Sequence, residues 1–164
     1  GSLRVSSCRA DSTSHPTNPR VTALMERERA AGMFSRDFYH GLQSAAEKIK
    51  DELLLFLVNS KTSGHKVLGY GAAAKGNTLL NFAGVKPDLL PSVADRSTFK
   101  QGRFLPGTRI PIVSPEDLVA SKPTRVVVLA WNLRTEVATE LRSLGLKNCE
   151  LYTAIPQLEM YERL

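Results

Sequence analysis

The sequence predicts an α/β protein of the Rossmann-like, doubly wound type, with about five mainly parallel strands and an N-terminal helical pair. From residue 66 onward, short apolar runs alternate with helical patterns, which is typical of right-handed βαβ units. Residues 126–131 are apolar without interruption, as expected of a strand covered on both faces. The length of 164 residues suits one domain with at most an additional arm.

The N-terminal part predicts a linker followed by two helices. Residues 1–18 are mostly polar, and the alternation of Leu3 and Val5 indicates a strand stub. Over residues 19–64 we expect a helical pair, in which Asn18 and Pro19 begin the first helix. The second helix is predicted over 37–60, because its apolar residues recur every three or four positions. We expect 19–164 to form one structural unit, with the Rossmann-like domain at 65–164.

Strands and helices alternate along that domain. Pro111 lies within the third predicted strand and indicates a sheet edge. Ligands of such sheets bind beyond the carboxyl ends of the strands, where the strand order reverses, so the loops after Tyr70, Ala94 and Trp131 are the candidate sites. The predicted strands are 67–71, 90–95, 110–113, 126–131 and 149–155, and the predicted helices are 75–83, 114–120, 133–144 and a short terminal helix from residue 156.

The first loop follows a strand and opens a helix, which is the context of a phosphate-binding turn. It is not a dinucleotide fingerprint, because Ala74 stands where a third glycine is needed. It is not a P-loop either, because Lys75 precedes Gly76. Lys75 and Thr78 favour anion binding, and a glycine turn that only packs strand against helix is the alternative. The candidate binding residues are Gly69, Tyr70, Gly71, Ala72, Lys75, Gly76, Asn77 and Thr78.

The second loop, residues 95–108, is long and basic. Asp95 ends a strand where Rossmann proteins bind a ribose hydroxyl. Lys100 and Arg103 are suited to pair with phosphate oxygens. A solvated, charged loop is the alternative. The candidate binding residues are Asp95, Arg96, Lys100, Gln101, Gly102, Arg103, Phe104, Pro106, Gly107 and Thr108.

The third loop begins with Trp131 and Asn132. The indole is suited to stack on a base or a sugar, and the amide to contact hydroxyl groups. Packing is the commoner role of a lone tryptophan, and it stays the alternative here.

Composition excludes several classes of protein. The net charge of +6 favours anionic partners. Residues 95–109 hold four basic residues against one acidic residue, and such a short basic loop fits a bound phosphate group better than nucleic acid. No apolar run approaches the ~20 residues that span a membrane, and no secretory signal is evident. Cys8 and Cys149 predict free thiols in a cytoplasmic protein. No spacing indicates a catalytic triad, a carboxylate pair or a metal site, so we expect neither catalytic residues nor a cofactor in this chain.

Several blocks of sequence carry a family resemblance. The segment GYGAAAKGNTLLN at 69–81 resembles a motif in the C-terminal domain of sugar C-methyltransferases. The blocks DR and KQGRFLPGT in residues 95–108, IPI at 110–112 and WNLR with Glu136 are similar to the blocks that follow it in that family. Residues 1–5, GSLRV, resemble the strand that ends the family's methyltransferase domain. The blocks occur in order and cover essentially the whole chain.

The resemblance implies a substrate-binding domain of an S-adenosylmethionine-dependent enzyme that methylates carbon in nucleotide-activated keto sugars. Family members carry a zinc-binding region and a methyltransferase domain that this chain lacks, so S-adenosylmethionine and zinc are expected there, and the chain alone is predicted to be inactive. Its expected partners are a nucleoside diphosphate sugar and its own methyltransferase domain, without nucleic acid or membrane. Val113-Ser114 and Leu129-Ala130 depart from the family pattern and leave the sugar open. The alternatives are a stand-alone nucleotide- or coenzyme A-binding Rossmann module and a purely structural domain.

Overall fold

The computed structural model describes residues 3–12 and 16–164, and its internal contacts divide the chain into two compact units, 1–45 and 46–164. The first unit contains α1 (Pro19–Ala30) and the 3-10 helix η1 (Asp37–Tyr39), and α2 (Leu42–Thr62) begins within it. Asn18 caps α1 through its side chain, as predicted. Residues 3–5 form no strand here, and residues 1–2 and 13–15 of the predicted linker lie outside the described part of the chain.

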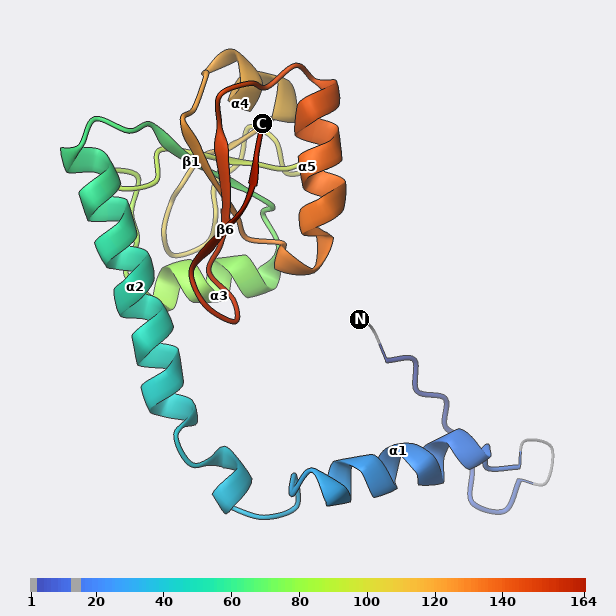
Figure 1. Cartoon of the computed structure of the whole chain (residues 1–164). Helices are drawn as coiled ribbons and strands as arrows, with labels where there is room; N and C mark the ends of the chain where they lie inside the picture. The colour runs from blue at the N-terminus through green and yellow to red at the C-terminus, as the bar shows by residue number, and fades with distance from the viewer. Residues whose placement is uncertain (1–2, 13–15) are drawn as a thin grey trace. The chain divides into compact units, whose positions relative to one another are not determined.

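The second unit contains a six-stranded sheet in the order β3-β2-β1-β4-β5-β6 (Figure 1). The pairs from β3 to β5 are parallel, and β6 is antiparallel to β5. The α/β fold class is therefore confirmed, and the strand that Pro111 precedes lies at an edge as predicted. The strands are β1 (Val67–Tyr70), β2 (Val93–Ala94), β3 (Ile112–Val113), β4 (Arg125–Val128), β5 (Glu150–Thr153) and β6 (Glu159–Arg163).

Helices cover both faces of this sheet. On one face, Leu53 and Leu57 of α2 and Leu80 of α3 join a buried cluster. On the other face, Leu118 of α4 and Leu141 of α5 join a second buried cluster. The connecting helices are α3 (Ala74–Phe82), α4 (Pro115–Ala120), η2 (Trp131–Leu133) and α5 (Arg134–Ser143). Both faces of the sheet are thus covered.

Two further sequence predictions were wrong in detail. The segment after Pro156 forms β6 and not a helix, because Tyr161 and Leu164 pack against the second cluster while the strand pairs with β5. The helix predicted over 37–60 is interrupted, because Gly41 adopts a left-handed φ of 85° between η1 and α2.

Other features of the described residues concern function. None of their helices is long and apolar enough to cross a membrane. No group of three or more His, Cys, Asp or Glu side chains among them is placed to hold a metal ion. Both cysteines are free thiols, with Cys8 exposed and Cys149 buried.

Candidate functional site

Two glycines fix the loop between β1 and α3 against the end of β4. Gly71 has a left-handed φ of 99°, and a Cβ atom there would lie 2.9 Å from Cβ of Ala130. A Cβ atom on Gly76 would lie 2.6 Å from Cβ of Leu129. Both positions therefore require glycine for close packing. The glycine turn therefore does pack strand against helix. The same packing places the first turn of α3 between β1 and β4, where the strand order reverses.

Lys75 joins the first and third loops at that point. Its Nζ atom lies 4.2 Å from the centroid of the Trp131 ring. It also donates a hydrogen bond to Oδ1 of Asn132. Within the described residues, the structure records no carboxylate at ion-pair distance from Lys75. The site thus presents a cation on an aromatic face that is hydrogen-bonded to a neutral amide.

Asp95 and Lys100 are bound to each other and to the first loop. Oδ2 of Asp95 accepts from the backbone N–H of Ala72 at 2.8 Å and from Nζ of Lys100 at 3.1 Å. Oδ1 accepts from the N–H of Ser97 at 2.9 Å. Nζ of Lys100 also donates to the carbonyl oxygen of Ala72 at 3.0 Å, and Nε2 of Gln101 donates to the carbonyl oxygen of Asp95 at 2.9 Å. The second loop is thereby tied to the first.

Tyr70 and Arg96 both contact Glu140, a residue of α5 that carries no signal in the sequence. The Tyr70 hydroxyl donates to one carboxylate oxygen, and Nε of Arg96 lies 3.0 Å from the other. Burial and the neighbouring Glu140 raise the pKa of Tyr70 well above its usual range. A hollow of about 410 Å³ is lined by Arg96, Glu140 and polar residues of α5. Tyr70 is 3% exposed, so its side chain lies in the core.

The remainder of the second loop lies elsewhere. Residues 102–105 run beside β3, on the side away from β2. The N–H of Gly102 donates to the Ile112 carbonyl at 2.9 Å, and the N–H of Ile112 donates to the Arg103 carbonyl at 2.8 Å. With strands about 4.8 Å apart, Arg103 is about 14 Å from β1 across the sheet. The sequence predicted Lys75, Lys100 and Arg103 as ligands of one diphosphate, whereas the backbone of Arg103 lies outside β3, at the edge of the sheet.

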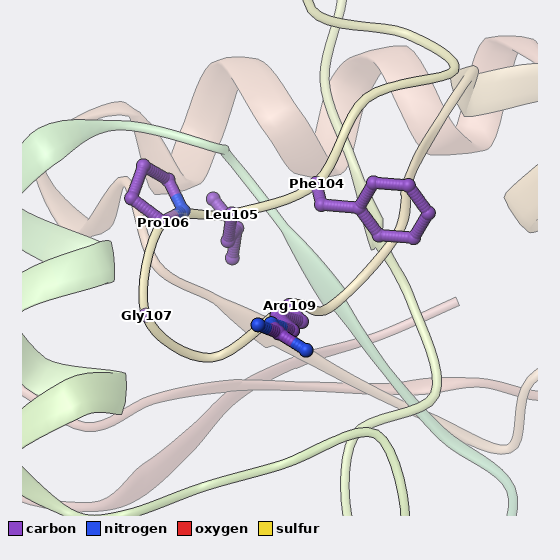
Figure 2. A pocket seen from close by; sticks show the side chains of 5 residues that line it. All are labelled: Phe104, Leu105, Pro106, Gly107 and Arg109. Carbon is purple, nitrogen blue, oxygen red and sulfur yellow. The ribbon is translucent and has the colours of Figure 1, made fainter.

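The tip of this loop is held at the far end of α3. Nδ2 of Asn81 donates to the Pro106 carbonyl at 3.0 Å, and Nζ of Lys86 donates to the Gly107 carbonyl at 2.9 Å. Asn81 lies about 10 Å of helix rise from the start of α3. Figure 2 shows Phe104 and Arg109 beside the tip, where a hollow of about 420 Å³ opens. Asn81 and Lys86 carried no sequence signal for this contact.

The other candidate residues have local roles. The Thr78 hydroxyl donates to the Ala74 carbonyl at 3.0 Å, and Asn77 accepts from Asn81 at 3.2 Å. Thr108 is buried, 1% exposed, and lies at the turn before Ile110. The structure therefore gathers Lys75, Trp131 and Asn132 beside the Asp95–Lys100 pair, and it places Phe104, Pro106, Gly107 and Thr108 outside that group.

A family model described as the C-methyltransferase C-terminal domain matches residues 1–156. The chain is also 32% identical over 123 residues to the C-methyltransferase NovU of Streptomyces niveus. That match covers 75% of this chain and 29% of NovU, so it corresponds to less than a third of the relative.

Proposed function

Since the chain belongs to the family of C-methyltransferase C-terminal domains, we propose that it binds the nucleoside diphosphate part of a sugar substrate. The site lies at the carboxyl ends of the parallel strands (the carboxyl edge), between the β1–α3 loop and η2. In this proposal Lys75 attracts the diphosphate, Trp131 contacts the base or the sugar, and Asn132 contacts a hydroxyl group.

The observation that carries the proposal is the Lys75–Trp131–Asn132 group at the switch point between β1 and β4. A cation with no carboxylate partner among the described residues is available to an incoming anion. Ala73, the residue before α3, makes no side-chain cap, so the first N–H groups of α3 are not satisfied by it. Those N–H groups and the helix dipole add to the attraction of a phosphate.

The methyl transfer itself is proposed to occur in the longer enzyme, where S-adenosylmethionine and zinc belong to regions outside this chain. In that enzyme S-adenosylmethionine would supply the methyl group, and a base there would take the proton beside the keto group of the sugar. The present chain is proposed to orient the substrate for that step and to be inactive alone.

The test uses Trp131 as an intrinsic probe, because it is the single tryptophan of the chain. Titration with dTDP or UDP is expected to change its fluorescence, and Lys75→Ala is expected to weaken binding about ten- to hundredfold. The matched control is Lys147→Ala, an exposed lysine between α5 and β5 at the opposite edge of the sheet. This control is expected to bind as the unmodified chain does.

Two results would count against the proposal. No fluorescence change at millimolar nucleotide would remove its support, and equal weakening by both lysine variants would indicate a general charge effect. Titration with coenzyme A separates the alternative of a coenzyme A-binding module, which predicts tighter binding of coenzyme A than of dTDP.

A further inference from the structure

The contacts of Asp95 and Lys100 do not fit the role of ligand-binding groups. Both carboxylate oxygens of Asp95 accept hydrogen bonds from the protein, and the Lys100 ammonium uses donors on Asp95 and on the Ala72 carbonyl. The Asp95 side chain is only 13% exposed, and that of Lys100 is 43% exposed. The N–H and the C=O of Ala72 are thus each held by one member of this pair.

We propose that Asp95 and Lys100 are positioning residues: Asp95 fixes the Ala72 peptide at the entrance to α3, and Lys100 cancels the charge of Asp95 so that an anion can approach. This inference rests on the proposed function. It replaces the roles that the sequence predicted for the pair, a ribose contact for Asp95 and a phosphate contact for Lys100.

Electrostatics explains why the pair is needed. A largely buried carboxylate beside an anion site repels the ligand, and water and salt screen this repulsion less than on an open surface. The hydrogen bond to Ala72 requires an oxygen acceptor at position 95, and the ammonium 3.1 Å away compensates its negative charge. The ligand then meets a fixed loop without a net negative charge.

A charge-cancelling role and a phosphate-ligand role predict different outcomes for a double variant. Lys100→Met exposes the charge of Asp95, so dTDP binding, followed by Trp131 fluorescence, is expected to weaken about ten- to hundredfold. Adding Asp95→Asn removes that charge while keeping an oxygen for Ala72, and binding is expected to return to within about threefold of the unmodified chain. A double variant that stays as weak as Lys100→Met would show that Lys100 is a ligand and would overturn the charge-cancelling role. Lys147→Met is the control for loss of a surface lysine.

A second measurement needs no nucleotide. In Asp95→Ala, hydrogen exchange at the Ala72 amide is expected to accelerate at least about tenfold, since its acceptor is gone. Asp95→Asn, which keeps an oxygen, is expected to retain most of the protection and controls for loss of folding. Unchanged exchange at Ala72 in Asp95→Ala would overturn the positioning role. If the unmodified chain binds no dTDP, the proposed function and the charge-cancelling role both fail, and the Ala72 exchange alone decides on positioning.

Discussion

Two cation–aromatic clusters differ in what surrounds the cation. One lies at the carboxyl ends of the parallel strands (the carboxyl edge), and the other lies at their amino ends (the amino edge). At the carboxyl edge, Lys75 lies over Trp131 beside a neutral amide. At the amino edge, the Arg125 guanidinium lies 5.5 Å from the ring of Phe56 and 5.9 Å from that of Tyr152. It also contacts Glu150 at 3.2 Å.

The difference separates a structural cation from an available one. Nη1 of Arg125 donates to the Ser60 hydroxyl at 2.8 Å, which links β4 to α2, and Glu150 also accepts from Tyr152 and Arg163. The charge of Arg125 is thus paired with Glu150 inside the fold. Lys75 has the same kind of aromatic neighbour but no carboxylate among the described residues, so its charge remains available to a ligand. The presence of a carboxylate, more than the aromatic contact, distinguishes the two clusters.

The largest effect is expected when the support of the carboxyl edge is broken. Gly76→Val places a branched side chain where a Cβ atom already comes within 2.6 Å of Cβ of Leu129. We expect a loss of about 3 kcal/mol of unfolding free energy, together with loss of nucleotide binding. Urea unfolding measures the first effect. Ala74→Val, on the exposed first residue of α3, is the control and is expected to change stability by less than about 1 kcal/mol.

A smaller effect is expected at the amino edge. Arg125→Met removes the contacts with Glu150 and Ser60, and we expect a loss of about 2 kcal/mol, a value reduced for the partial exposure of the pair. Nucleotide binding should be unchanged, because the cluster lies at the other edge. An Arg125→Met chain that unfolds as readily as the unmodified one would contradict the structural role of this cation.

Acid is expected to weaken the amino-edge cluster. The hydrogen bond from Tyr152, and then Arg125 and Arg163, hold the pKa of Glu150 below its ordinary value of 4.5. A depressed pKa in the folded state gives stability that is complete above 4.5 and is lost as the pH falls through the folded value. Urea midpoints between pH 7 and 3 should therefore fall less steeply in Glu150→Gln than in the unmodified chain. Identical slopes would contradict this assignment.

The smallest effect on stability is expected at Lys75. Lys75→Ala should change the unfolding free energy by no more than about 0.5 kcal/mol, because its partners are an exposed amide and a ring face. Lys75→Ala would then weaken nucleotide binding and leave stability nearly unchanged, whereas Arg125→Met would lower stability and leave binding unchanged. A destabilisation as large as that of Arg125→Met would make Lys75 a structural residue as well.

The sequence predicted the three loops at the strand ends, because apolar runs and glycine turns are local signals, whereas the reversal of strand order between β1 and β4 is seen only in the structure. It also identified Lys75, Trp131 and Asn132, which the fold brings together. It did not predict that Arg103 lies beyond β3, since a loop's path across a sheet edge depends on pairing with Ile112. Nor did it predict Glu140 or Asn81 as partners, because each is an ordinary polar residue on a helix whose contact lies far along the chain. The error at β6 has the same origin, as pairing with β5 overrides a weak local pattern.

Backbone amide shifts during titration with dTDP and UDP test the central claim most directly. Nucleotide binding at the carboxyl edge predicts that shifts concentrate in residues 71–78, 95–101 and 131–133, while the loop tip at 104–109 and the Arg125 cluster change little. Lys75→Ala should reduce these shifts at a given nucleotide concentration. Shifts that centre on 104–109, or none in the three loops at millimolar nucleotide, would contradict the account.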